Sequence, residues 1–299
     1  MSYVKRNWKE YNKKLVNRGN IFLWIEEDTF NQWTVKKKKR GRPAFSSSVI
    51  QAGWFLKTFY RCTLRALQGF LDSLIKLMKK DQRSPHYTVF CKRAVEAAAR
   101  LPKLSQRRPT DLIIDSSGLK ILGEGEWKDK VHRSRTRKSW IKLHIALDER
   151  TQEVTAAVVS DEYTSDSSAL PFLIEKSPKS VTKVLADGAY DRSSVREFLT
   201  DQKIDPCIPP RRGGILRKEP YMESRNQDIL AIRGLGNNEE GFALWKKLRL
   251  YHRRSLVETA FSRLKSLFGN RLNNKKYQNQ KAEIEFRLHA LNRSLQFQN

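Results

Sequence analysis

The stretch Leu250–Phe268, written LYHRRSLVETAFSRLKSLF, carries two side-chain patterns that repeat at helical spacing. The first is a broad apolar face, which predicts a helix packed against a hydrophobic core. The second is a stripe about 60° wide, taking about 100° per residue, and it holds four polar residues: Tyr251, Arg254, Glu258 and Lys265. A surface helix with an ordinary Arg254–Glu258 pair at i, i+4 would show the same stripe. Its meaning therefore depends on the rest of the chain.

Short hydrophobic runs upstream of this stretch predict a sheet. Five of them have strand length and turn residues at their ends: 111–118, 140–148, 153–160, 180–186 and 204–208. A capped helix over 165–175 and a second helix around Val195–Leu199 separate the later runs. We expect an α+β or α/β fold, with a mixed five-stranded sheet flanked by helices. This order of elements, closed by the helix at 250–268, is that of a ribonuclease H-like fold.

Two aspartates follow buried runs directly and are themselves followed by small residues. Asp115 comes before Ser116, and Asp187 comes before Gly188. Each alone could simply begin a turn. Asp148 is predicted to start a hairpin turn, and Asp191 to cap the following helix. Together with Glu258, however, Asp115 and Asp187 offer the hard oxygen ligands that Mg²⁺ or Mn²⁺ prefers.

The formal charge narrows the range of partners. Lys and Arg number 59 against 32 Asp and Glu, which gives a net charge of +27 over 299 residues. A field of this size attracts polyanions, and nucleic acid is the commonest of them. No apolar run is long enough for a membrane span, and the first residues resemble no secretory signal. The three scattered cysteines look like reduced thiols. We expect a cytoplasmic protein without membrane contact.

The N-terminal third is predicted to be helical. After short helices over 1–35, three helices follow between Ser46 and Ala99, and the third bears Lys92 and Arg93. This arrangement resembles a helix-turn-helix unit in which Lys92 and Arg93 contact DNA. A plain helical bundle would give the same hydrophobic pattern.

A dense basic run precedes these helices. It spans 36–43, and its cations are predicted DNA contacts: Lys36, Lys37, Lys38, Lys39, Arg40 and Arg42. Such cations can follow a phosphate backbone or enter a minor groove, although a solvated linker would have the same composition.

These patterns divide the chain into two expected domains. Residues 1–105 form a DNA-binding region with the basic linker 36–43. Residues 106–299 form a catalytic domain with an insertion at 209–240 and a basic helical tail at 270–299. Trp245, just after the insertion, is expected to pack it against the core. The alternative is that its ring stacks on a DNA base drawn out of the duplex.

Three segments resemble the catalytic blocks of bacterial insertion-sequence transposases of the DDE class. They are DLIIDSSG, VLADGAYD and Tyr-x2-Arg-x3-Glu-x6-Lys at 251–265. The last matches the family signature residue by residue, and the resemblance extends over nearly the whole chain. One departure is Val131-His132-Arg133-Ser134, where many relatives have His-Gly or a similar small-residue pair.

The resemblance implies an activity and a set of ligands. Asp115, Asp187 and Glu258 would bind two Mg²⁺ ions, with Mn²⁺ as a substitute, while Tyr251, Arg254 and Lys265 would contact DNA. The expected reaction is metal-dependent cleavage and transfer of DNA strands at terminal inverted repeats. The partners would be double-stranded transposon ends and target DNA, bound by a homodimer or a higher multimer.

Three other functions share part of this pattern. A ribonuclease H-like nuclease would use the same fold and metals without needing the Tyr-Arg-Glu-Lys signature. A non-catalytic, transposase-derived DNA-binding protein would keep the helical head, but we would expect it to lack an acidic ligand. A ribosomal or RNA-packaging protein would explain the charge alone.

Overall fold

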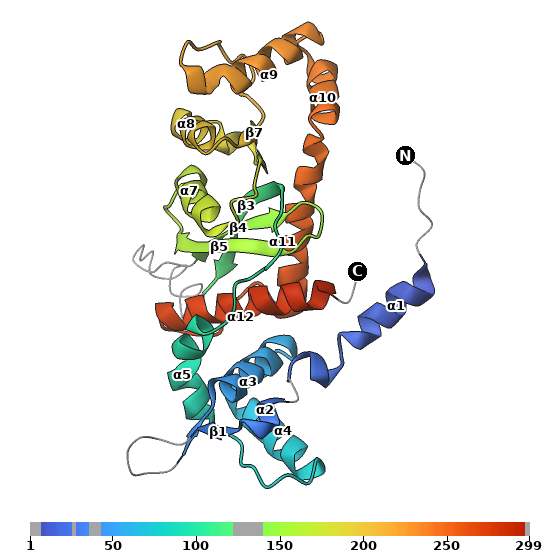
Figure 1. Cartoon of the computed structure of the whole chain (residues 1–299), viewed down its shortest axis with the longest axis vertical. Helices are drawn as coiled ribbons and strands as arrows, with labels where there is room; N and C mark the ends of the chain where they lie inside the picture. The colour runs from blue at the N-terminus through green and yellow to red at the C-terminus, as the bar shows by residue number, and fades with distance from the viewer. Residues whose placement is uncertain (1–6, 26–27, 36–42, 122–139, 297–299) are drawn as a thin grey trace, which may run out of the picture. The chain divides into compact units, whose positions relative to one another are not determined.

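The computed structural model describes residues 7–25, 28–35, 43–121 and 140–296 (Figure 1). The chain forms two compact units, and each is described by itself. One spans Met1–Pro102 and Ser266–Asn299, and the other spans Lys103–Lys265. Among the described helices, none has the length and apolar character needed to cross a membrane.

The second unit is built on a mixed sheet of five strands in the order β5-β4-β3-β6-β7. The central strand β3 pairs in parallel with β6 and antiparallel with β4, which in turn pairs antiparallel with β5. The strands are β3 (Asp111–Lys120), β4 (Trp140–Asp148), β5 (Val154–Asp161), β6 (Lys183–Leu185) and β7 (Asp205–Cys207). The predicted mixed, ribonuclease H-like sheet is confirmed.

Burial explains why β3 is the central strand. Three consecutive residues of this strand are fully buried: Leu112, Ile113 and Ile114. Because neighbouring side chains on a strand point to opposite faces, both faces of β3 are covered. Helices α7 (Asp166–Lys176) and α8 (Ser193–Asp201) contribute Leu170, Leu173 and Leu199 to the same core. Between the antiparallel strands β4 and β5, Asp148 accepts hydrogen bonds from the Arg150 amide and the Thr151 hydroxyl, as predicted for a residue that starts a hairpin turn.

The strand register corrects one expectation about the aspartates. Asp115 does not end its strand, because β3 continues to Lys120 along β4. The pairing between β3 and β6 does end, at Ile113 opposite Leu185. Asp115 and Asp187 each lie two residues beyond that last pair. The two carboxylates therefore lie where two parallel strands part, although only Asp187 is past the end of its own strand.

The insertion is longer than the sequence predicted. Beyond β7 the chain forms η3 (Pro220–Met222), α9 (Glu223–Gly234) and α10 (Glu239–Leu248), so helical structure runs past 240. Leu250 then adopts a left-handed conformation with φ 56°. This single left-handed residue interrupts the right-handed helical backbone between α10 and the next helix. The hydrophobic periodicity of the sequence does not indicate the interruption.

The helix predicted over 250–268 is divided into two parts. Tyr251–Arg254 is a 3-10 turn, η4, and the α-helix α11 covers Ser255–Phe268. Trp245, on α10, therefore does not share a helix with Tyr251. The apolar face of α11 is buried as predicted, through Val257, Ala260 and Leu264.

The first unit is mostly helical. Its elements are α1 (Trp8–Asn17), η1 (Ile21–Leu23), α2 (Asp28–Asn31), α3 (Ser47–Phe59), α4 (Leu64–Leu77), α5 (Tyr87–Ala99), α12 (Tyr277–Gln296) and a two-stranded ribbon of β1 (Thr34–Val35) and β2 (Ala44–Phe45). The three predicted central helices are present. Helix α12 packs against α3 and α5, and the Trp54 and Phe286 rings stack with centroids 5.3 Å apart. The expected tail 270–299 thus belongs to this unit and not to the catalytic domain.

Each unit contains a buried histidine whose charged form is disfavoured. Burial lowers the pKa of His144 and of His289 to about 4. The unfolded chain binds a proton near pH 6.5 and the folded chain only near pH 4, so this contribution to stability is present above pH 6.5 and is lost as the pH falls toward 4. Between pH 7 and pH 4.5, the free energy of unfolding of the unmodified chain should fall by about 2 to 3 kcal/mol more than that of a His144→Gln variant.

Urea unfolding at the two pH values measures this difference. His252→Gln, at an exposed position of η4, is the matched control. An equal loss of stability with falling pH in the His144 variant and in the unmodified chain would contradict the prediction.

Candidate active site

Asp115 lies at the centre of a charged cluster at the place where the central strand β3 and its neighbour β6 stop pairing. Its Oδ1 accepts a hydrogen bond from the Ser116 amide at 2.8 Å, and its Oδ2 accepts one from Arg254 NH2 at 2.8 Å. Burial raises the pKa of the Asp115 carboxyl, and the charges of Asp187 and Asp166 raise it further, against the Ser116 bond and the Arg254 charge. Burial, the largest of these causes, therefore disfavours the charged form of Asp115 even with Arg254 beside it.

Asp187 lies just beyond the end of the adjoining strand β6, and its charge acts on Asp115. Its Oδ1 accepts a hydrogen bond from the Ala189 amide at 2.9 Å and so starts the 3-10 turn η2 (Gly188–Tyr190). This turn fixes the direction of the carboxylate just after β6, where the chain leaves the sheet. Its charge acts on Asp115, Arg254 and Tyr251, which places it in the same cluster.

Glu258 reaches the cluster from the first turn of α11. Arg254 NH1 donates to Glu258 Oε1 at 2.7 Å, while the other terminal nitrogen donates to Asp115. One guanidinium thus joins a carboxylate of the sheet to a carboxylate of the helix. The Glu258 side chain keeps 59% of its exposure, against 16% for Asp115, so the cluster is open on the helix side.

Of the other two residues of the polar stripe, Lys265 bonds to the same strand, and Tyr251 interacts electrostatically with Arg254, Asp187 and Asp115. Lys265 Nζ donates to the Ser117 hydroxyl at 2.7 Å, two residues along β3 from Asp115. Burial raises the pKa of Tyr251 to about 12, so its phenol keeps its proton at neutral pH. The structure therefore brings Asp115, Asp187 and the whole stripe of Tyr251, Arg254, Glu258 and Lys265 together.

The cluster has the ligand chemistry of a hard cation site but not its geometry. Among the described residues, no three His, Cys, Asp or Glu side chains stand in a metal-binding arrangement. The Arg254 guanidinium holds Asp115 and Glu258 through its two terminal nitrogens. Three carboxylates with a cation already between two of them fit a divalent ion once the guanidinium moves aside.

Sequence reasoning missed a layer of polar residues that supports Asp115. Asp166 Oδ1 accepts the Ser116 hydroxyl at 2.7 Å and pairs with Lys142 Nζ at 3.1 Å. The His144 ring, fully buried, bonds to the Ser160 hydroxyl at 2.8 Å. Tyr190 is buried as well, and the charges of Asp166, Asp115 and Asp187 reach its hydroxyl. In the sequence, the alternation of Lys142 and His144 in a hydrophobic strand was the available signal.

Asp191 does not cap a helix, contrary to the prediction. The residue before α8 is Arg192, which makes no side-chain cap. Asp191 instead forms ion pairs with Arg196 and Arg225, both at 3.1 Å, and its side chain is 2% exposed. A buried carboxylate needs such partners, and Arg225 lies on α9, so this network fastens the insertion to the sheet layer.

Trp245 is buried, as expected, but the partners that the structure shows for it are residues of the insertion and the ring of Tyr251. Trp245 is 1% exposed, its indole N–H donates to Asp228 Oδ1 at 2.9 Å, and its ring stacks on Phe242. A ring enclosed in this way has no free face for a DNA base.

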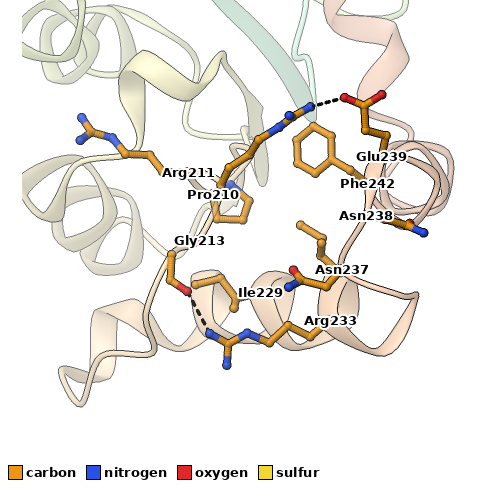
Figure 2. Close-up of a pocket in the computed structure, with 12 residues that line it drawn as sticks. Pro210, Arg211, Gly213, Ile229, Arg233, Asn237, Asn238, Glu239 and Phe242 are labelled. Atoms are coloured by element: carbon orange, nitrogen blue, oxygen red, sulfur yellow. Dashed lines mark hydrogen bonds and ion pairs between the residues drawn. The ribbon is translucent and has the colours of Figure 1, made fainter.

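The insertion also encloses a cavity of about 250 Å³, shown in Figure 2. Two of the three arginines that line it have partners in the wall. Arg212 pairs with Glu239 at 3.0 Å, and Arg233 donates to the Gly214 carbonyl at 3.1 Å. These bonds tie the loop after β7 to α9 and α10, so the cavity lies within the internal framework of the insertion.

The predicted DNA contacts of the first unit fare differently. Lys36, Lys37, Lys38, Lys39, Arg40 and Arg42 lie outside the described residues, as does Val131-His132-Arg133-Ser134. Lys92 is exposed on α5. Arg93, in contrast, uses all three of its nitrogens internally, toward Glu96, the Phe45 carbonyl and Ser47. It anchors α5 to the start of α3 instead of facing outward.

Comparison with known proteins agrees with this geometry. Two family models, each described as a transposase DDE domain, match residues 106–293 and 16–124. A solved structure of the piggyBac transposase synaptic complex with hairpin DNA is similar, with a TM-score of 0.46 and 10% identity. That similarity covers 95% of this chain and 74% of the other. Since the first family model alone spans more than half of its residues, the chain belongs to the DDE transposases and is a DNA transposase.

Proposed function

We propose that this transposase binds the terminal inverted repeats of an insertion sequence and cleaves and joins their strands with Asp115, Asp187 and Glu258. The observation that supports this most strongly is the pair of ion-pair contacts that the Arg254 guanidinium makes with Asp115 and Glu258. Arg254 lies 139 positions from Asp115 in the sequence, and its guanidinium joins the central strand β3 to Glu258 on α11.

Transposases of this family work with divalent metal ions. We propose two Mg²⁺ ions here, with Mn²⁺ as a substitute, held by Asp115, Asp187 and Glu258. Two such ions would supply activation of the attacking oxygen and stabilisation of the leaving oxygen. The all-carboxylate donor set supports the assignment, because hard divalent ions prefer carboxylate oxygens. The raised pKa of the partly buried Asp115 is consistent with it, since a bound cation would stabilise the charged form.

Arg254, Lys265 and Tyr251 would bind the DNA backbone. The planar fork of a guanidinium suits two phosphate oxygens as well as two carboxylates. When the carboxylates are otherwise neutralised, Arg254 can turn to a phosphate beside them. Lys265 offers a second positive contact, and the protonated Tyr251 hydroxyl can donate a hydrogen bond.

The finer features of the partnership are proposals as well. Double-stranded transposon ends and target DNA would be bound by a homodimer or higher multimer in the bacterial cytoplasm, at the nucleoid. Lys36–Arg40, Arg42 and Lys92 remain proposed DNA contacts of the first unit.

Removing a single carboxylate should separate chemistry from binding. Asp115→Asn, Asp187→Asn and Glu258→Gln should each lower strand cleavage by at least about 1,000-fold, because each loses several kcal/mol of metal-dependent stabilisation. Binding of the element's end, measured by fluorescence anisotropy, should change little. Asp201→Asn, at an exposed position of α8, is the control. Near-normal cleavage by any one of the three variants would remove that residue from the proposed site.

Removing Arg254 should have opposite effects on metal and on DNA. Without its guanidinium, Asp115 and Glu258 are free for a cation, so Arg254→Gln should bind Mn²⁺ about tenfold more tightly in the absence of DNA. The same variant should cleave DNA more slowly, because a phosphate contact is lost. Mn²⁺ titration followed by electron paramagnetic resonance measures the first effect.

The neighbouring Arg253 gives a matched control, since it pairs with Glu149 at 2.9 Å outside the cluster. Arg253→Gln should leave Mn²⁺ affinity unchanged. If Arg254→Gln binds Mn²⁺ no better than Arg253→Gln does, the guanidinium does not occupy the place of a metal.

A further inference from the structure

The first unit contains a cavity of about 580 Å³ that none of the catalytic residues reaches. Its wall comes from the end of α3, the turn that follows, the first turns of α4 and α5, and the loop before α12. The lining carries four cations and no carboxylate: Lys57, Arg61, Arg65 and Lys92. A concave wall of one charge sign focuses the electric field and concentrates ligands of the opposite charge.

Lys57 is the most unusual member of this set. It is only 7% exposed, yet its ammonium makes no hydrogen bond or ion pair to the residues that the structure describes. Its Nζ lies 4.9 Å from the centre of the Trp54 ring. Burial lowers its pKa, and the nearest compensating charge is Glu283. That carboxylate is already bonded to Arg287 at 2.7 Å and to the Asn273 and Asn274 amides.

A buried ammonium without an acceptor is costly to keep, because desolvation of the charge is only partly offset by an aromatic ring. The same cost makes it an effective anion ligand, since a bound oxyanion would supply the missing acceptors. Arg61, Arg65 and Lys92 are exposed at the rim of the cavity, and none forms an ion pair within the described part of the chain. Arg65 instead lies over the Tyr87 ring, at 4.6 Å.

Two helix starts add to this positive field. Thr63, the N-cap of α4, and Thr88, in the first turn of α5, both line the cavity. The amides of a first helical turn favour anions. This contribution supports the anion preference that the unpaired Lys57 indicates, and it would not be sufficient alone.

We propose that this cavity binds a backbone phosphate of DNA, with Lys57 at its floor and Arg61, Arg65 and Lys92 at its rim. The proposal rests on the DNA-binding function above and gives it a place in the first unit. It differs from the base recognition that is typical of a helix-turn-helix unit, because a phosphate contact positions the duplex without selecting its sequence.

The test uses the full chain in metal-free buffer, so that catalysis plays no part. Lys57→Met replaces the ammonium by an apolar group of similar length. Its affinity for a 30-base-pair duplex, measured by fluorescence anisotropy, should fall about tenfold. The slope of log affinity against log salt should fall by about 0.9, the value for one lost phosphate contact. The melting temperature without DNA should hold or rise, because an uncompensated charge has been removed.

Lys92→Gln tests the rim and does not depend on how the core accepts the Lys57 change. It should lower the salt slope by a similar amount. Lys76→Gln, an exposed lysine in the last turn of the same helix as Arg65, removes an equal charge and should leave the slope unchanged. Unchanged affinity and slope in both Lys57→Met and Lys92→Gln would overturn the proposal, as would equal losses in Lys76→Gln.

Cys91 gives an independent readout, because it is exposed and lines the cavity. The duplex should protect Cys91 from maleimide, and thymidine monophosphate at the same phosphate concentration should not. Protection by the free nucleotide with none by the duplex would assign the cavity to a small phosphate ligand and refute the DNA proposal. If the unmodified chain binds no duplex at all, the proposed function itself fails; duplex binding without Cys91 protection refutes only the cavity.

Discussion

The architecture of the catalytic unit depends on the repulsion between carboxylates gathered at one edge of the sheet. Two such charges about 5 Å apart repel by roughly 3 kcal/mol at an effective dielectric constant of about 20. Arg254 limits this cost by donating to Asp115 and Glu258 at once. Asp115 still has a raised pKa, so the balance is incomplete. In the proposed mechanism a bound cation would take over this role, and a DNA phosphate would give the guanidinium a new partner.

The backbone determines where this charge can gather. Strands β3 and β6 stop pairing after Ile113 and Leu185, and the two aspartates follow at equal distance from that point. The 3-10 turn η4 then presents Arg254 at the start of α11, one helical turn before Glu258. The left-handed Leu250 interrupts the helical backbone just before this turn, so α10 of the insertion and α11 are separate helices.

The sequence was sufficient for the sheet and for the order of its elements, because strand length, turn residues and helical spacing are local properties. The proposed acidic ligands could be singled out only when these patterns were combined with the resemblance to a family. It could not indicate that α12 belongs with α3 and α5, since the stacking of Trp54 on Phe286 joins residues far apart in the chain. Asp191 was misinterpreted for the same reason. Its role depends on Arg225, which the insertion supplies from another part of the sequence. The polar layer under Asp115 was missed because Asp166 looks like any acidic residue in a first helical turn.

The central claim is that Asp115, Asp187 and Glu258 hold divalent ions together, and iron-directed cleavage of the polypeptide tests it most directly. Fe²⁺ takes the place of Mg²⁺, and ascorbate with peroxide then generates hydroxyl radicals that cut the backbone next to the ion. The account predicts cuts in β3 near Asp115, after β6 near Asp187 and at the start of α11, all suppressed by excess Mg²⁺ and absent from Asp115→Asn. Cuts confined to other segments, or cuts that Mg²⁺ does not suppress, would contradict it.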